Sequence, residues 1–320
     1  MKALVTYNPK SGTQKITKNQ EIVKSKLEEA GYEVEFFPSP APKSITEYIK
    51  NNGNNYDLIL TSGGDGTLNE TVTGMMQGDV KTKLAYIPAG TVNDVGKILK
   101  LKKDVKKGLD IATKGVPVKL DIVKINDNYS AYIIAAGKFT AISYDIEYKS
   151  KKRWGKLAYG FRLLREIPKK SGMRLRLTFP DGKTYSNCYV VFGFNWQQFG
   201  GFKIYRRNKP LLNDGKMDIT VIEKTKHLSM FRLMNFVLLG ERLRKKAVRT
   251  FTCDKVKIEC DREIDYNVDG EFAFTSKEAM LEVKKQAISI IVPYKTYKKL
   301  FDNEFILQSD KIEDIKKCKN

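Results

Sequence analysis

Short apolar runs alternate with amphipathic stretches from residue 1 to about residue 122. The apolar runs predict β-strands at Ala3–Tyr7, Glu33–Phe37, Asp57–Thr61 and Lys83–Ile87. Helical periodicity predicts helices at Thr17–Ala30, Ser44–Asn51, Thr67–Met76, Val92–Leu99 and Val105–Lys114, with Thr67 as a candidate N-cap. This alternation is typical of right-handed strand–helix–strand units around a parallel sheet. Residues 1–122 are therefore predicted to form an α/β domain with a parallel, Rossmann-like sheet.

The pattern changes after Asp121 to short apolar and aromatic runs separated by turn residues. These runs predict strands at Tyr129–Ala135, Arg174–Phe179, Tyr185–Phe194, Met217–Val221, Lys255–Cys260, Glu263–Val268 and Ile288–Pro293. Asp181-Gly182 and Asp269-Gly270 have the residue types of hairpin turns. Residues 123–293 are predicted to form an antiparallel β-sandwich with helices inserted at 149–170 and 227–246. Residues 294–320 are expected to pack back on the first domain.

The composition limits the possible partners and reaction mechanisms. The chain has 320 residues and a formal net charge of +21, which attracts nucleic acid, an anionic membrane or a phosphorylated small molecule. A solvated, lysine-rich surface would explain the same charge without any partner. His227 is the only histidine, so Ser-His-Asp and Cys-His mechanisms are excluded. The four cysteines lack metal-ligand spacing, which indicates reduced thiols.

Three segments that follow predicted strands have the residue types of phosphate-binding loops: Asn8–Gly12, Gly63–Thr67 and Pro88–Asp94. In a parallel sheet such segments emerge at one edge, where α/β folds bind ligands. Glycines let backbone N–H groups approach phosphate oxygens, and the next helix N-terminus favours negative charge. One Gly-Gly-Asp-Gly segment alone is equally compatible with a plain turn. Three loops at one edge favour a phosphate site, with further donors or positive charge from Thr67, Asn69, Thr91, Lys10 and Lys15.

Two carboxylates lie among these donors. Asp65 and Asp94 would repel phosphate unless a divalent cation lay between them, which indicates Mg²⁺. Neither a GxxxxGK[ST] loop nor the protein-kinase motif set is present, so the predicted site is of another kind.

The segments "YNPKSG", "SGGDGTLNETVTG" and "IPAGTVNDVGKIL" together resemble the diacylglycerol kinase catalytic domain, which bacterial lipid kinases and sphingosine kinases share. The resemblance continues through "LLNDGKMDI" and "YNVDGEF" and so covers most of the chain. It implies an ATP- and Mg²⁺-dependent kinase that transfers the γ-phosphate to a lipid hydroxyl. Diacylglycerol, converted to phosphatidic acid, is the first expectation.

The resemblance also implies site residues. It places the nucleotide at Asn8, Pro9, Lys10, Ser11, Gly12, Lys15, Ser39, Gly63, Gly64, Asp65, Gly66, Thr67, Leu68, Asn69, Thr91 and Asp94. Asp65, as a catalytic residue, and Asp94 would position Mg²⁺ through water. A structural metal would be held by Asp214 with the backbone carbonyls of Leu211 and Lys216. The general base would be Asp269 or Glu271, although an Asp-Gly pair between strands is most often simply a hairpin turn.

Residues 149–170 combine aromatic and aliphatic residues with positive charge, as an interfacial helix does. An amphipathic helix packed on the β domain would have the same pattern. The expected lipid-surface contacts are Lys152, Arg153, Arg162, Arg165 and Lys169. With no signal peptide or membrane-spanning stretch apparent, we expect a cytoplasmic protein that associates peripherally with the inner membrane surface.

Other functions remain open at this stage. The acceptor could be phosphatidylglycerol or a sphingoid base, and an NAD kinase would share the Gly-Gly-Asp-Gly loop. A non-enzymatic protein that binds an anionic membrane or nucleic acid would explain the charge, but it would not require Asp65, Asp94, Asp214 and Asp269. The basic residues lack the regular aromatic interleaving of a single-strand binding groove, so nucleic acid is not an expected partner. A homodimer is possible.

Overall fold

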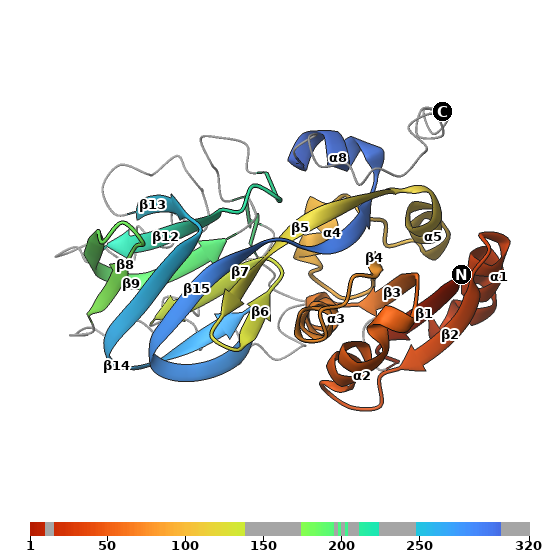
Figure 1. Cartoon of the computed structure of the whole chain (residues 1–320), viewed down its shortest axis with the longest axis horizontal. Helices are drawn as coiled ribbons and strands as arrows, with labels where there is room; N and C mark the ends of the chain where they lie inside the picture. Colours follow the sequence, from red (N-terminus) through yellow and green to blue (C-terminus); the bar gives the residue numbers. More distant parts are fainter. Residues whose placement is uncertain are drawn as a thin grey trace, which may run out of the picture. The chain divides into compact units, whose positions relative to one another are not determined.

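The computed structural model describes residues 1–9, 16–137, 174–194, 198–199, 202–203, 211–223 and 248–301, and it contains two compact units (Figure 1). Of these residues, unit 1 comprises 1–9, 16–122, 211–215 and 284–301, and unit 2 comprises the others. The predicted boundary assigned 211–215 and 284–292 to the β domain. They belong instead to unit 1, because strand β15 (Glu271–Val292) is far longer than the predicted strand and continues from one unit into the other.

Unit 1 is built on a parallel sheet. Its strand order is β2-β1-β3-β4-β15, from β1 (Lys2–Tyr7), β2 (Glu33–Pro38), β3 (Leu58–Gly63), β4 (Lys83–Pro88) and the end of β15. The α-helices are α1 (Gln20–Glu29), α2 (Ser44–Asn52), α3 (Asp65–Gln77), α4 (Asp94–Ile98), α5 (Val105–Lys114) and α8 (Tyr294–Leu300), and the 3₁₀ helices are Thr17–Asn19 and Gly53–Asn55. The predicted strand–helix alternation is confirmed. Strand β5 (Val116–Ile125) was missed, although its alternating Val116, Val118 and Leu120 carry the period of a strand.

Helices cover both faces of this sheet. Because strand side chains alternate, Val5 and Leu60 face α1 and α5 in one apolar cluster, whereas their neighbours Leu4 and Ile59 face the opposite side. The apolar sides of α2 and α3 are buried there, and Thr46 Oγ1 of α2 donates to the Glu70 carbonyl of α3 at 3.0 Å. This three-layer arrangement explains why the strands read as nearly continuous apolar runs.

Unit 2 is antiparallel. Its strands are the end of β5 with β6 (Asn128–Ser130), β7 (Ile133–Gly137), β8 (Leu175–Thr178), β9 (Thr184–Phe194), β12 (Met217–Glu223), β13 (Val248–Cys253), β14 (Lys255–Val268) and the first part of β15. Strands β10 (Gln198–Phe199) and β11 (Phe202–Lys203) pair with each other in antiparallel orientation. The long strands β9 and β14 both pair with β8 near one end and with β7 near the other, so they contribute to both sides of the sandwich.

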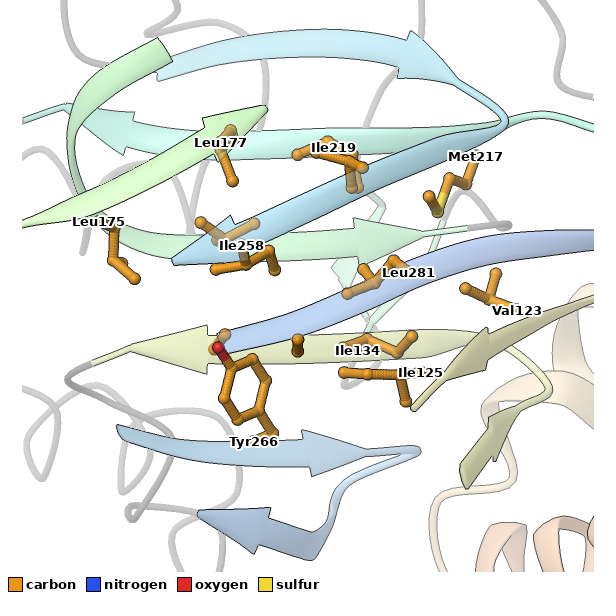
Figure 2. Close-up of a cluster of buried hydrophobic side chains, with 14 of the residues drawn as sticks. Val123, Ile125, Ile134, Leu175, Leu177, Met217, Ile219, Ile258, Tyr266 and Leu281 are labelled. Atoms are coloured by element: carbon orange, nitrogen blue, oxygen red, sulfur yellow. The ribbon is translucent and has the colours of Figure 1, made fainter. Parts of the chain in front are cut away.

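One apolar cluster fills the interior of unit 2. Leu177 and Ile258 come from paired strands, and Ile219, Ile134 and Leu281 face them from other strands (Figure 2). The predicted β-sandwich is therefore confirmed. The two strands predicted at 255–260 and 263–268 are one strand, β14, whose register with β15 shifts between Glu259 and Ile264. The helices predicted at 149–170 and 227–246 lie outside the described residues.

Among the residues that the structure describes, no helix is long and apolar enough to cross a membrane.

Candidate active site

The strand register brings the predicted loops to one edge of the parallel sheet. Tyr7 at the end of β1 is paired with Ser62 of β3, and Gly63 is paired with Pro88 at the end of β4. The segments that follow β1, β3 and β4 therefore begin side by side, as expected from a parallel sheet. Asn8 and Pro9 are half-buried at this edge. The predicted contacts Lys10, Ser11, Gly12 and Lys15 lie outside the described residues.

The loops after β3 and β4 are joined by backbone hydrogen bonds. The carbonyl oxygen of Gly63 accepts from Ala89 N at 2.8 Å, Gly90 N at 3.2 Å and the Tyr86 hydroxyl at 3.0 Å. Gly90 packs so closely on Gly64 that a Cβ added to Gly90 would lie 2.5 Å from the Gly64 Cα atom. Glycine is required at this contact because backbone lies against backbone. The two loops therefore form one continuous turn region.

Asp65 and Asp94 meet in this region. Asp65 is the first residue of α3 and Asp94 the first residue of α4, and Asp94 N donates to Asp65 Oδ2 at 3.2 Å. Asp94 is 1% exposed, and its Oδ1 lies 3.5 Å from Lys97 Nζ. Burial, reinforced by the negative charge of Asp65, raises the pKa of Tyr86 well above its ordinary value. Two carboxylates at two helix N-termini make an oxygen-rich site beside backbone N–H donors.

Asn93 holds the loop after β4 in shape. Its backbone has φ +52°, in the left-handed region that asparagine tolerates better than most residues. Its Oδ1 accepts from Gly90 N at 2.9 Å, and its Nδ2 donates to the Gly90 carbonyl. Asn93 was not among the predicted site residues, although its position in "GTVND" placed it beside Asp94.

The other predicted contacts have varied surroundings. Thr67 is not the N-cap of α3, because the helix begins at Asp65 with Gly64 as its cap. Thr67 instead packs on Gly63, where an added Cβ would meet its Oγ1 at 2.4 Å. Leu68 is buried, and its backbone N–H donates to the Gly64 carbonyl at 3.1 Å. Both contacts stabilise the start of α3. Gly66, Asn69 and Ser39 are half-buried, and Thr91 is exposed at the same sheet edge.

A second carboxylate site lies at the turn of residues 211–216. Asp121, fully buried on β5, accepts from Gly215 N and from Gln286 N, both at 2.6 Å. Burial, reinforced by the charge of Asp214, raises the pKa of Asp121 to about 6, although the two backbone hydrogen bonds act in the opposite direction. Sequence reasoning predicted Asp214 but missed Asp121. The available signal was an aspartate inside the apolar run "VKLDIVKI".

Asp269 forms the turn between β14 and β15. It has φ +51°, Gly270 has φ +89°, and Val268 pairs with Glu271, which is the geometry of a two-residue hairpin. The hairpin predicted at Asp269-Gly270 is thus confirmed.

The Asp269 carboxylate also organises a distant segment of unit 2. It is 4% exposed and accepts from Ser130 Oγ at 2.7 Å, Ala131 N at 2.8 Å, and Tyr132 N and Ile133 N at 3.0 Å. Glu271, by contrast, is exposed at the start of β15. The two predicted base candidates therefore have opposite environments.

The predicted lipid-surface residues Lys152, Arg153, Arg162, Arg165 and Lys169 lie outside the described residues. Leu211 is half-buried, and Lys216 is exposed at the turn that also carries Asp214.

A parallel sheet that presents glycine turns, helix N-termini and paired aspartates at one edge is the arrangement with which α/β folds bind phosphate groups. The chain therefore belongs, by its fold and its loops, to the α/β proteins with a candidate phosphate site.

Comparison with known proteins identifies the family. Residues 2–125 match the diacylglycerol kinase catalytic domain, and residues 133–292 match the YegS C-terminal NAD kinase beta sandwich-like domain. The chain is 30% identical to a diacylglycerol kinase of Staphylococcus epidermidis and 29% identical to one of Staphylococcus aureus, over 98% of each chain. A crystal structure described as a diacylglycerol kinase from Bacillus anthracis has the same fold, with a TM-score of 0.75 and 22% identity over 92% of this chain and 98% of that chain. The chain belongs to the diacylglycerol kinase family and is a lipid kinase, which implies a lipid and a nucleotide as substrates.

Proposed function

We propose that this lipid kinase transfers the γ-phosphate of ATP to the free hydroxyl of diacylglycerol, giving phosphatidic acid. The observation that carries the nucleotide half of the proposal is the joined turn region, in which Asp65 and Asp94 lie beside two glycine turns. The names of the relatives, together with identity along nearly the whole chain, support diacylglycerol as the acceptor.

In this proposal unit 1 binds and orients the phosphates. The glycine turns after β3 and β4 would donate backbone N–H groups, and the N-terminus of α3 would add its positive end. Asp65 and Asp94 would hold Mg²⁺, since their carboxylate oxygens are the hard donors that this cation prefers. Bound there, Mg²⁺ would neutralise charge that develops on the transferred phosphoryl group. The positive Lys97 beside Asp94 is placed to limit repulsion within the site.

We further propose that Glu271 accepts the proton of the lipid hydroxyl and that Asp269 shapes the turn that carries Glu271. A proton on the Asp269 carboxylate would compete with the four donors that already surround it. Glu271 is exposed at the first residue of β15 and is not held in this way by the turn. A general base must come within hydrogen-bond reach of the proton that it abstracts, and an exposed carboxylate is accessible to an incoming hydroxyl.

We also propose a divalent cation at the turn of residues 211–216, held by Asp214 and the carbonyls of Leu211 and Lys216. The residues fit such an ion, because Gly215 N of the turn donates to the fully buried Asp121 carboxylate at 2.6 Å, next to the second carboxylate of Asp214. A cation there would offset the repulsion between the two negative charges. Its contribution would be structural, joining the turn to strands β5 and β15.

This metal proposal predicts a change in thermal stability. Without nucleotide, Mg²⁺ at a hundred times its Kd should stabilise the wild-type chain by about 2.7 kcal/mol, seen as a rise in Tm. The rise should be smaller in Asp214→Asn than in the wild-type protein, because only the proposed site at Asp65 and Asp94 remains, and it should be unchanged in Asp79→Asn, a control at an aspartate whose side chain is 85% exposed in unit 1. An equal rise in both variants would contradict the assignment.

The acceptor is tested directly. Purified protein is incubated with ATP, Mg²⁺ and mixed micelles that carry diacylglycerol, phosphatidylglycerol or sphingosine, or with NAD in solution, and phosphate incorporation is measured. We expect incorporation into diacylglycerol that is abolished by a metal chelator. Transfer to a different lipid would correct the acceptor, and transfer to NAD alone would overturn the proposal.

A lipid acceptor lies in a bilayer, so the protein must meet a membrane surface. Its charge of +21 would favour an anionic surface at about 1 kcal/mol for each nearby Lys or Arg. The basic residues of 149–170 remain the predicted contacts.

A further inference from the structure

A row of buried polar side chains crosses three strands directly beneath the joined turn region. Thr6 of β1 pairs with Thr61 of β3, and Thr61 pairs with Tyr86 of β4. All three lie on the sheet face that α2 and α3 cover, and none is more than 4% exposed. Buried polar groups are costly unless they are hydrogen-bonded, so an apolar row would be the default at this depth.

The threonines continue into α3 as a chain of hydroxyl groups. Thr6 Oγ1 and Thr61 Oγ1 are 2.9 Å apart, and Thr61 Oγ1 and Thr71 Oγ1 are also 2.9 Å apart. Thr71 Oγ1 then donates to the carbonyl oxygen of Thr67 at 3.0 Å. This chain of hydroxyl groups therefore starts on β1, crosses β3 and ends in the first turn of α3, where Thr67 packs on Gly63.

The number of protons that each hydroxyl can donate fixes the direction of the hydrogen bonds along these threonines. A threonine hydroxyl has one proton to donate. Because Thr71 gives its proton to the Thr67 carbonyl, it must accept from Thr61, and Thr61 must in turn accept from Thr6. Each hydroxyl then donates once and accepts at most once. Hydrogen bonds aligned in this way polarise one another in a low-dielectric interior, so the chain is stiffer than three separate contacts.

We propose that Thr6, Thr61 and Thr71 are positioning residues for phosphoryl transfer, because they fix the first turn of α3 against the ends of β1 and β3. That turn carries Asp65 and the backbone N–H groups that face the proposed phosphate site. Tyr86, the fourth polar member of this layer, holds the other side of the same region through the Gly63 carbonyl. The inference rests on the proposed function, and it adds residues that touch neither nucleotide nor lipid.

The test compares Thr61→Val, which keeps the shape but removes the central hydroxyl, with Thr61→Ser, which keeps the hydroxyl. Thr82→Val is the matched control. The Thr82 hydroxyl is also buried, and it lies 2.8 Å from both the Gly53 and the Tyr56 carbonyl oxygen, which share its single proton. It lies just before β4, at the amino end of the strand and thus at the opposite edge of the sheet.

Three quantities are measured: Tm, the Kd for ATP with Mg²⁺, and amide hydrogen exchange of residues 63–70 in the free protein. Thr61→Val removes two hydrogen bonds, one from Thr6 and one to Thr71. We expect it to raise both the exchange rate and the Kd by about tenfold or more, since the net loss of one hydrogen bond already corresponds to about that factor. Thr61→Ser should have an exchange rate and a Kd within about threefold of the wild-type values. Thr82→Val should lower Tm and leave both the exchange rate of residues 63–70 and the Kd unchanged. If Thr61→Val folds poorly, Thr71→Val removes the hydroxyl that accepts from Thr61 and donates to the Thr67 carbonyl, and it should show the same two changes.

The outcomes separate the inference from the proposed function. If Thr61→Val lowers Tm but leaves exchange and Kd as in Thr82→Val, the threonines are ordinary core residues and the inference is overturned. If the wild-type protein does not bind ATP, the proposed function fails. The exchange measurement then still decides whether the threonine chain fixes the turn.

Discussion

Asp65→Asn is expected to lower kcat for phosphoryl transfer by roughly 10²–10³-fold, the usual effect of removing one preorganised electrostatic group. The physical reason is charge rather than shape. Asparagine retains an oxygen that can accept from Asp94 N, the contact now made at 3.2 Å, so the turn should survive. It loses the negative charge that would hold Mg²⁺ beside the phosphates.

The measurement is initial-rate kinetics over a range of Mg²⁺ concentrations, with Tm recorded for each protein. The variant should keep its Tm within about 2 °C, because a substitution that preserves size and hydrogen bonding costs little. Asp110→Asn on α5 is the control, since it removes the same charge at an exposed helix position. An Asp65→Asn enzyme with wild-type rates and an unchanged Mg²⁺ requirement would refute the role of Asp65.

Asp269→Asn is expected to destabilise the protein by about 3 kcal/mol, because hydrogen bonds to a charged group contribute about 1.5–3 kcal/mol each and a buried donor left unsatisfied costs about as much. The carboxylate is surrounded by one hydroxyl and three backbone N–H groups of residues 130–133. An amide would direct its own NH₂ group at one of these donors. For a chain of 320 residues the loss corresponds to a fall in Tm of roughly 4–5 °C.

Asp181→Asn is the matched control for stability. Asp181 is also followed by glycine in a hairpin, but it is exposed and its contacts are with Lys183 in the same turn. We expect a change below about 0.5 kcal/mol, as is usual for exposed positions. Thermal unfolding of the two variants side by side measures the difference.

Glu271→Gln completes this comparison. If Glu271 accepts the proton, its loss should lower kcat by about 10²-fold or more, the range for general bases, with Tm unchanged. An Asp269→Asn protein as stable as wild type but without transfer activity, beside an active Glu271→Gln protein, would reverse the two roles.

The parallel half of the fold was predictable because its signals are local. Strands buried on both faces read as apolar runs, and glycine turns with polar residues follow them in the chain. The antiparallel half was also recognised by short runs and Asp-Gly turns. Strand β5 was missed although its alternation was present, and the extent of β15 was missed because a strand that passes from one unit to another has no boundary signal in the sequence.

The loops of the proposed nucleotide site were predicted as a group, because parallel strands bring the loops that follow them to one edge of the sheet. Their internal arrangement was not predictable. Asn93 and Tyr86 act through contacts with Gly90 and Gly63, residues near in space that belong to different segments.

The sequence by itself determined that this chain has a parallel α/β sheet, an antiparallel β domain and glycine–aspartate loops of the diacylglycerol kinase type, since each of these depends on residue type and local period. Asp181 and Asp269 show what it did not determine, because both stand before glycine between two strands. Tertiary structure alone makes them different. The Asp269 carboxylate meets donors 136 to 139 residues earlier in the chain, whereas the Asp181 carboxylate accepts from the backbone and the side chain of Lys183, two residues later. Burial and long-range hydrogen bonding depend on how strands pair, and no local pattern encodes that pairing.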